Sequence, residues 1–339
     1  MEAGIERRIG ATGLTVSQMG FGAAPLGNLF AALGEETAHQ TVRAALAAGI
    51  RYFDTAPLYG HGLSEHRIGA ALRDVPRDDY VLSTKIGRLL VPGESRALAD
   101  ENFYRPLPFD TPFDYSYDGT MRSFEDSLQR LGMSRIDILL IHDVDVWTHG
   151  SQAAADARFE EVMAGGYRAL VKLRGEGVIG AIGAGLNEWR ACQRFAERGD
   201  FDCFLLASRY TLLEQGALAS FLPLCQERNI SIVIGGPFNT GILATGASEG
   251  ALYDYKPAPP EILARVAAIE NVCRNHGVAL AAAALQFPLH HPAVAAVIPG
   301  ARSAEEIKRN SATLAADIPA ALWAELKAEG LLHGDAPVP

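Results

Sequence analysis

The sequence contains few cysteines and no long hydrophobic run, and both shortages limit what the protein can be. The cysteines Cys192, Cys203, Cys225 and Cys273 are widely separated and form no Cys-x-x-Cys pair. This spacing argues against a zinc knuckle or a disulfide framework and is typical of buried thiols in a reducing compartment. The most apolar segment, 278–287, is too short to cross a bilayer.

Basic clusters and a leader pattern are missing as well. No run of Lys or Arg is present and the formal net charge is −10, which argues against a nucleic-acid partner. The opening MEAGIERRIGATG carries charge with no apolar stretch behind it, unlike a signal peptide. We therefore expect a cytoplasmic protein that binds small molecules but neither nucleic acid nor membranes. The sequence leaves its oligomeric state open.

Two ligand-binding motifs are incomplete. His61 and His66 flank Glu65, but this spacing does not match His-Glu-x-x-His, so we expect no metal site. Gly20-Phe21-Gly22 is followed by Ala-Ala-Pro rather than by the third glycine of a dinucleotide fingerprint, and Pro25 interrupts the helix start. An open doubly wound sheet is therefore disfavoured.

Short apolar runs alternate with amphipathic stretches along the whole chain. This alternation predicts parallel strands covered by helices, and eight such units favour a (β/α)₈ TIM barrel over an open sheet. We expect residues 1–339 to form one domain. The predicted strands are Met19–Gly22, Ile50–Asp54, Tyr80–Lys85, Ile136–His142, Val178–Gly183, Cys203–Leu206, Ile230–Ile234 and Val294–Ile298. The clearest predicted helices are Glu35–Ala48, Met121–Leu131, Arg158–Arg174, Asn187–Arg198, Glu214–Glu227 and Glu261–His276.

Two segments fall outside this alternation. Arg7–Gly10 and Leu14–Ser17 flank Ala-Thr-Gly, which predicts an N-terminal β-hairpin that plugs the bottom of the barrel. Residues 87–119 form a long irregular stretch rich in proline and aromatic residues after the third strand. Loops of this length are usually functional or disordered, and the aromatics argue against disorder. We interpret it as a substrate lid; the alternative is a surface insertion that covers the barrel edge.

Four ionisable residues follow the ends of predicted strands: Asp54, Tyr59, Lys85 and His142. The carboxyl ends of barrel strands meet at one rim, so these side chains should converge. An ammonium group beside a phenol lowers the pKa of that phenol. Lys85, held by Asp54, would then prepare Tyr59 to act as a general acid or base, while His142 binds the substrate oxygen or relays a proton. Each residue alone could equally be structural, but together they indicate catalysis.

Phe53-Asp54-Thr55-Ala56-Pro57-Leu58-Tyr59-Gly60, with Lys85 and His142 after later strands, closely resembles the aldo-keto reductase superfamily. The resemblance runs over essentially the whole chain. It implies that the four residues form a catalytic tetrad with tyrosine as proton donor or acceptor. It also implies an NAD(P) cofactor bound without a Rossmann domain.

Longer segments resemble the aldose 1-dehydrogenase branch of that superfamily. This branch includes D-threo-aldose (L-fucose), L-galactose and pyridoxal 4-dehydrogenases, which oxidise a cyclic hemiacetal to a lactone. The resemblance therefore implies an NAD(P)-dependent oxidoreductase of aldopyranoses, or alternatively of pyridoxal. The segments that carry it are Lys85–Leu90, Phe113–Gly119, Ile141–Asp143, Ala207–Leu213 and Gly235–Gly241.

The loops after the seventh and eighth strands commonly bind phosphate in such barrels. Glycines there allow close backbone approach, and a helix that begins at Ser303 offers free amides to an anion. The alternative is that these glycines serve only to let the loops turn. With the resemblance, the expected cofactor-binding residues are Gly22, Ala23, Asn187, Gly235, Gly236, Pro237, Phe238, Gly241, Pro299, Gly300, Ala301, Arg302, Glu306 and Asn310.

The chain departs from NADPH-preferring relatives at three aligned positions. Gly300, Ala301 and Glu306 stand where those relatives carry Lys, Ser and Arg. Glu306 would repel a 2′-phosphate and accept a bond from a 2′-hydroxyl, so we expect NAD to be preferred to NADP. Ser303 and Glu306 also form a capping box, in which Glu306 merely caps the helix, and Arg302 keeps dual specificity open.

Two further departures remove side chains that are expected to contact the nicotinamide. The serine of the usual Ser-Asn pair is replaced in Leu186-Asn187, and the usual glutamine on the sixth strand aligns with Ala207. Trp147 is a candidate for stacking on a sugar, although a tryptophan there could instead be buried or at an interface. The remaining alternatives are NADPH-dependent aldehyde reduction, a non-catalytic nicotinamide-binding subunit and, least favoured, a metal-dependent hydrolase.

Overall fold

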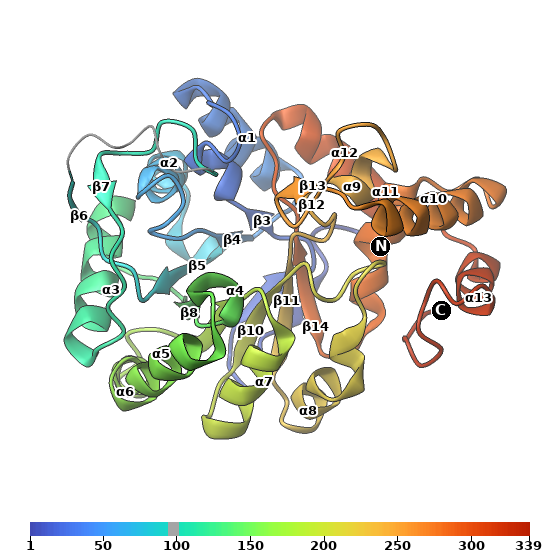
Figure 1. Cartoon of the computed structure of the whole chain (residues 1–339). Helices are drawn as coiled ribbons and strands as arrows, with labels where there is room; N and C mark the ends of the chain where they lie inside the picture. Colours follow the sequence, from blue (N-terminus) through green and yellow to red (C-terminus); the bar gives the residue numbers. More distant parts are fainter. Residues whose placement is uncertain (94–101) are drawn as a thin grey trace.

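The computed structural model describes residues 1–93 and 102–339, and its centre is an eight-stranded parallel sheet surrounded by helices (Figure 1). Bridges from Met19 to Val297 and from Gly22 to Gly300 join the first strand to the last, which closes the sheet into the predicted barrel. In order around the barrel, the strands are β3 (Phe21–Gly22), β4 (Tyr52–Asp54), β5 (Val81–Ile86), β8 (Ile138–His142), β9 (Ala181–Leu186), β10 (Cys203–Ala207), β11 (Ser231–Gly235) and β14 (Val294–Ile298).

The N-terminal hairpin closes one end of the barrel, as predicted. Strands β1 (Glu6–Arg8) and β2 (Thr15–Ser17) pair antiparallel. Ile9 and Val16 of this hairpin are buried in one cluster with inward-facing strand residues such as Ile138 and Leu140. Because this apolar plug fills the amino-terminal end of the barrel, ligands can enter only from the opposite end.

Helices cover the outside of the barrel and bury their apolar faces against the strands (Figure 1). The longer ones are α1 (Glu35–Ala47), α2 (Leu63–Leu72), α3 (Tyr117–Leu131), α5 (Gln152–Ala164), α6 (Gly166–Gly175), α7 (Trp189–Arg198), α8 (Phe221–Glu227), α10 (Pro260–Asn275), α11 (Leu280–Gln286), α12 (Ala304–Ala315) and α13 (Ala320–Ala328). Two short helices, α4 (Val146–His149) and α9 (Ile242–Thr245), lie in strand-to-helix connections.

Several elements differ from their predicted bounds, and three of the differences concern a divided helix, a shorter helix and a later strand. The stretch Arg158–Arg174 is divided at Gly165, because a side chain there would lie 2.7 Å from the backbone nitrogen of Tyr117. Hydrophobic periodicity does not register such a close approach. The stretch Glu214–Glu227 is helical only at a short 3-10 turn, Gly216–Ala219, and at α8. The fifth strand begins at Ala181 rather than Val178, because the preceding residues turn out of α6.

The connection after β5 contains a small hairpin. Strand β6 (Val91–Pro92) pairs with β7 (Phe109–Asp110), and further bridges join Arg88 to Phe113 and Leu29 to Phe103. Residues 94–101 of the predicted lid lie outside the described residues. The described parts of this connection thus pack on the barrel near its carboxyl end.

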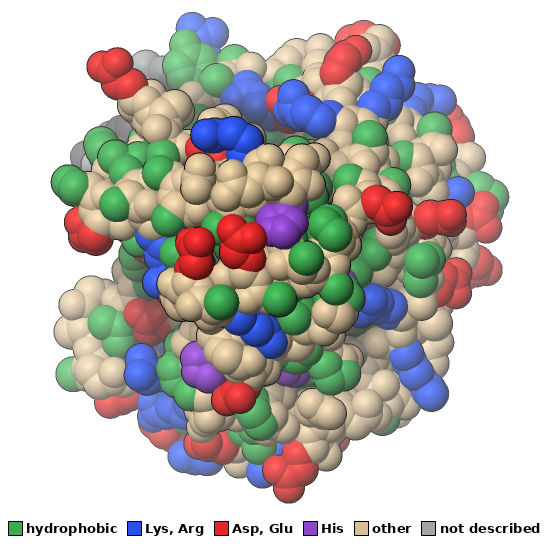
Figure 2. All heavy atoms as spheres, turned by 90° about the vertical axis from the view of Figure 1, so that its right-hand side faces the viewer, with side chains coloured by type: hydrophobic (Ala, Val, Ile, Leu, Met, Phe, Trp, Pro, Cys, Tyr) green, Lys and Arg blue, Asp and Glu red, His purple; other side chains and the backbone are tan. Residues whose placement is uncertain are grey.

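Figure 2 shows the face that carries the C-terminal helices, where acidic, basic and hydrophobic side chains are interspersed without a broad patch of one sign. Across residues 1–93 and 102–339, no helix combines the length and apolar character needed to span a bilayer.

One glycine contact fixes the loop that carries Tyr59, and it generates a prediction. A side chain at Gly27 would lie 2.5 Å from the carbonyl carbon of Tyr59, and Gly60 has a φ of +63°. We expect Gly27→Ala to destabilise the fold by about 1–3 kcal/mol, because the two backbones must separate. Thermal unfolding measures the effect, with Gly175→Ala, which meets no atom within 4 Å, as the control. Equal melting temperatures for both variants would contradict this account.

Candidate active site

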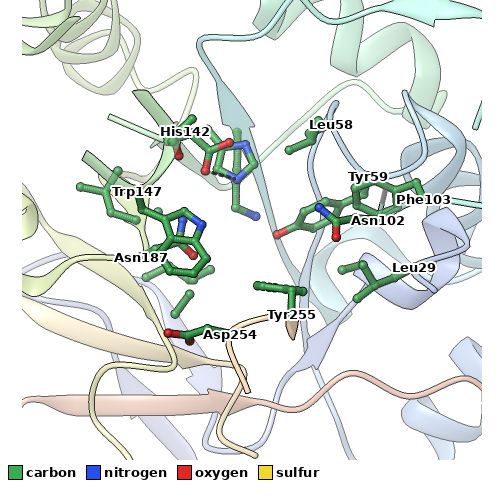
Figure 3. A pocket seen from close by; sticks show the side chains of 18 of the residues that line it. Leu29, Leu58, Tyr59, Asn102, Phe103, His142, Trp147, Asn187, Asp254 and Tyr255 are labelled. Carbon is green, nitrogen blue, oxygen red and sulfur yellow. Dashed lines mark ion pairs between the residues drawn. The ribbon is translucent and has the colours of Figure 1, made fainter. Parts of the chain in front are cut away.

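The carboxyl ends of β4, β5 and β8 bring the four predicted residues together. Asp54 and His142 end their strands, Lys85 is the penultimate residue of β5, and Tyr59 lies in the loop after β4. Tyr59, Lys85 and His142 line a cavity of about 590 Å³ (Figure 3). The sequence-based expectation that these side chains share one rim therefore agrees with their placement.

A buried ion pair lies at the base of this cavity. Lys85 Nζ is 2.7 Å from Asp54 Oδ2, and these side chains are 1% and 2% exposed. Lys85 also donates to the carbonyl oxygen of Thr55 at 2.8 Å, while Ser83 Oγ donates to Asp54 Oδ1 at 2.6 Å. These bonds offset the cost of removing both charges from water. The ammonium group is thereby fixed 4.8 Å from the centre of the Tyr59 ring.

The phenol of Tyr59 is a weaker acid than we expected. Burial raises its pKa well above the usual value, and the charge of Asp54 raises it further. The net shift of the Tyr59 pKa in the protein alone is therefore opposite to the one that we expected beside an ammonium group. The physical reason is that Asp54, in contact with Lys85, offsets the ammonium charge, so desolvation of the phenolate dominates. Tyr59 is accordingly a protonated phenol near neutral pH.

His142 is held as a neutral imidazole. Burial lowers its pKa well below the usual value, and the positive charges of Lys85 and Arg88 act in the same direction. Its ring lies edge-on to that of Tyr59, with 6.0 Å between the centres. Nε2 is 3.4 Å from Asp143 Oδ1, whereas Nδ1 is buried without a hydrogen-bond partner among the described residues. A neutral imidazole can donate one hydrogen bond to a substrate oxygen.

Loops supply most of the cavity wall, and sequence reasoning missed several of them. Trp147, predicted to contact substrate, lies in this wall and is 43% exposed. The missed contributors are the loop after β3 and a hairpin between α9 and α10, formed by β12 (Leu252–Tyr253) and β13 (Lys256–Pro257). The aromatic-acidic run Tyr253-Asp254-Tyr255 was an available signal. Missed cavity residues are Leu29, Phe30, Leu252, Asp254, Tyr255 and Lys256.

Contacts across the mouth join these loops. The rings of Phe30 and Tyr255 are 5.9 Å apart, although both residues have positive φ angles of +63° and +64°. Arg209 donates to both carboxylate oxygens of Asp254, at 2.9 and 3.0 Å, and its guanidinium lies 5.6 Å from the Trp147 ring. The opening is therefore framed by aromatic side chains and ion pairs.

The predicted cofactor residues surround the same rim. Asn187 lines the cavity beside Trp147 (Figure 3). Gly22 and Ala23 end β3, Gly235 to Gly241 connect β11 to α9, and Pro299 to Arg302 connect β14 to α12. Glu306 and Asn310 lie on α12, where Asn310 is buried.

The start of α12 suits a nucleotide. Its first backbone N–H groups lack carbonyl partners within the helix, as at any helix N-terminus, and can bind an anion. Glu306 accepts a hydrogen bond from Arg302 N at 2.8 Å, and Ser303 Oγ accepts from Glu306 N at 3.2 Å. Arg302 donates to the carbonyl oxygens of Leu29, Ala31 and Ala32 at 3.0–3.3 Å. Ser303 and Glu306 thus form the capping box that the sequence predicts as an alternative, and the other N–H groups of this first turn can bind an anion such as a nucleotide phosphate.

Within residues 1–93 and 102–339, no three His, Cys, Asp or Glu side chains are grouped closely enough to hold a metal ion.

Comparisons with known proteins agree with this geometry. Residues 18–329 match the model of the Aldo/keto reductase family, which confirms the predicted resemblance. The pyridoxal 4-dehydrogenase of Microbacterium luteolum is 43% identical over 98% of this chain and 99% of its own length. The D-threo-aldose 1-dehydrogenase of a Pseudomonas species is 42% identical over 93% and 94%. The L-galactose dehydrogenase of Arabidopsis thaliana is 30% identical over 91% and 87%.

Solved structures show the same fold. An aldo-keto reductase of Bacillus halodurans, in its holo form, superposes with a TM-score of 0.74 and 25% identity, covering 98% of this chain and 97% of that chain. The glycerol dehydrogenase of Gluconobacter oxydans gives a TM-score of 0.76 with 22% identity, covering 100% and 98%.

The buried ion pair leads to a stability prediction. Lys85→Met leaves Asp54 charged and unpaired in the barrel, so we expect a loss of about 3–5 kcal/mol in the free energy of unfolding. Adding Asp54→Asn removes that charge and should recover much of the loss. Denaturant unfolding of the single and double variants measures this coupling. A double variant no more stable than Lys85→Met would refute the assignment of the loss to an unpaired carboxylate.

Proposed function

Because the chain belongs to the aldo/keto reductase family and is an NAD(P)-dependent oxidoreductase, we propose that it oxidises the cyclic hemiacetal of an aldopyranose to a lactone. L-Fucose or another D-threo-aldose, or L-galactose, is the proposed substrate. The observation that carries the proposal is a phenol and a neutral imidazole that face one cavity above a buried lysine–aspartate pair.

In the proposed reaction, Tyr59, Lys85, His142 and Asp54 are the catalytic group. His142 Nε2–H donates to the C1 oxygen and orients it, and Tyr59 removes the proton of that hydroxyl. The base is the phenolate form of Tyr59, which becomes the phenol as it takes the proton, and Lys85, fixed by Asp54, stabilises that phenolate before the transfer. When bound, the nicotinamide supplies the hydride acceptor for C1. In the reverse direction the protonated phenol of Tyr59 donates to a carbonyl oxygen.

We propose NAD as the preferred cofactor, with NADP as a second possibility. The carboxylate of Glu306, in the first turn of α12, would repel a 2′-phosphate, and the guanidinium of Arg302 is engaged by the carbonyls of the loop after β3. The residues proposed to hold the nucleotide are Gly22, Ala23, Asn187, Gly235, Gly236, Pro237, Phe238, Gly241, Pro299, Gly300, Ala301, Arg302, Glu306 and Asn310.

Trp147 is proposed to stack on the sugar ring, and the connection 87–119 is proposed to select the substrate, because Arg88, Asn102 and Phe103 line the cavity. We further propose that the single domain works in the cytoplasm. Its four cysteines are free and buried, which suits a reducing compartment.

A second candidate activity is oxidation of pyridoxal to its lactone. Pyridoxal is an aromatic ring with a cyclic hemiacetal, and Phe30, Phe103, Trp147 and Tyr255 offer aromatic contacts around the cavity. The test is to offer L-fucose, D-arabinose, L-galactose and pyridoxal side by side with NAD or NADP, following the absorbance of NADH or NADPH. Turnover of pyridoxal without turnover of any sugar would select the second candidate; turnover of aldehydes with NADPH alone would indicate a reductase.

The raised pKa of Tyr59 determines how the rate of oxidation changes with pH. Because its pKa is raised, the phenolate is scarce near neutral pH, so we expect oxidation to accelerate from about pH 7 to about pH 10. The lowered pKa of His142 keeps its imidazole neutral throughout this range. Tyr59→Phe should reduce kcat/KM by about 10²–10⁴ and abolish the alkaline rise. A flat profile in the wild type, or activity that survives in Tyr59→Phe, would exclude Tyr59 as the base.

Glu306 gives a prediction for the cofactor. Glu306→Gln keeps an oxygen for the backbone of Arg302 but removes the charge, so kcat/KM with NADP should rise about tenfold, equivalent to about 1.4 kcal/mol. The value with NAD should change little. Glu305→Gln, on the same turn, is the matched control. If both variants change the ratio of kcat/KM with NADP to kcat/KM with NAD equally, the effect comes from the loss of a negative charge in general and not from the position of Glu306.

A further inference from the structure

A second carboxylate reaches the cavity next to the proposed catalytic group. Asp143 follows His142 directly and has a φ of +59°, a left-handed conformation that is costly for a residue other than glycine. The local backbone is held in place because the Tyr115 hydroxyl donates to the carbonyl oxygen of His142 at 2.6 Å. The Asp143 carboxylate therefore faces the cavity in a fixed orientation.

Arg88 binds only one of the two oxygens of the Asp143 carboxylate. Its Nε and Nη2 both donate to Oδ2, at 3.2 and 2.9 Å, and its guanidinium stacks 4.0 Å from the Phe113 ring. A structural arginine–carboxylate pair usually places two donors on two oxygens. Here Oδ1 is left toward the cavity, where His142 Nε2 lies at a distance of 3.4 Å, longer than a strong hydrogen bond.

Asp254 provides an internal comparison. It also lines the cavity, has a φ of +52° and pairs with an arginine. Arg209, however, donates to each of its two oxygens, at 2.9 and 3.0 Å. Asp254 is thus satisfied by its partner, whereas Asp143 retains an acceptor.

The position of Asp143 Oδ1 indicates which substrate group it can bind. The hydroxyl that is oxidised must lie against Tyr59 and His142 Nε2, and Asp143 Oδ1 is adjacent to that same nitrogen. An ionised carboxylate can only accept hydrogen bonds, so it suits a second substrate hydroxyl beside the first. Its charge extends across the cavity, since it helps to raise the pKa of both Tyr59 and Tyr255.

We propose that Asp143 Oδ1, held by Arg88, accepts a hydrogen bond from the hydroxyl on the carbon next to the oxidised carbon. Asp143 is then a specificity-determining residue for sugars with a free hydroxyl at C2, and it disfavours substrates with an anion at that place. This inference rests on the proposed function, because it takes an aldopyranose as the substrate.

The test compares the wild type and one variant, each with sugars that have the C2 hydroxyl and with sugars that lack it. Asp143→Asn is the variant, because asparagine tolerates a positive φ and Arg88 will bind its amide oxygen, leaving an NH₂ toward the cavity. The substrate pairs are L-fucose with 2-deoxy-L-fucose and D-arabinose with 2-deoxy-D-ribose, in which only the C2 hydroxyl is removed. Asp254→Asn is the matched control.

We expect Asp143→Asn to lower kcat/KM about 10- to 100-fold for the sugars with the C2 hydroxyl, the effect of a charge-assisted hydrogen bond. For the deoxy sugars the change should be less than about threefold, and Asp254→Asn should not discriminate within a pair. Equal losses on both members of a pair would overturn the inference while leaving aldose oxidation intact. If the wild type oxidises no aldopyranose, the proposed function fails first and the inference fails with it.

Discussion

The ion pair between Lys85 and Asp54 is the constraint on which the rest of the site depends. Two opposite charges inside an apolar barrel are tolerated because Ser83 and the Thr55 carbonyl complete their hydrogen bonds. That arrangement requires β4 and β5 in register, with Asp54 opposite Ser83 and Lys85 two residues further along. The closed sheet, the plug at its lower end and the close contact of Gly27 with the Tyr59 loop all preserve this register and its surroundings.

The same pair sets the resting protonation of its neighbours. The charge of Lys85 is offset by Asp54, so burial prevails and Tyr59 stays a phenol, while burial, together with the charges of Lys85 and Arg88, lowers the pKa of His142 and keeps it an uncharged imidazole. The cavity thus presents one proton donor, one neutral hydrogen-bonding ring and a separate carboxylate at Asp143. The charged side chains next to the reacting region lie in pairs, Lys85 with Asp54 and Arg88 with Asp143.

Sequence patterns predicted the barrel, the hairpin and the convergence of four side chains, because strand ends in a parallel barrel share one rim regardless of detail. The break at Gly165 and the later start of β9 were not predicted, since both depend on tertiary contacts that hydrophobic periodicity does not register. The Tyr253–Tyr255 hairpin escaped notice because its short strands give no periodic signal. The direction of the Tyr59 pKa shift was not predicted, because the burial of the phenol, its largest cause, and the charge of Asp54 depend on the folded surroundings.

The strands and the loops of this barrel have different roles in the site. The ion pair and His142 are carried by strands and Tyr59 by the connection after β4, whereas most of the remaining cavity wall comes from the connections after β3, β5, β8, β9 and β11. Substitutions in one connection can therefore reshape the wall without disturbing the proton-handling group or the other connections. Changes in these loops can therefore alter which substrate fits the cavity while the buried ion pair is kept.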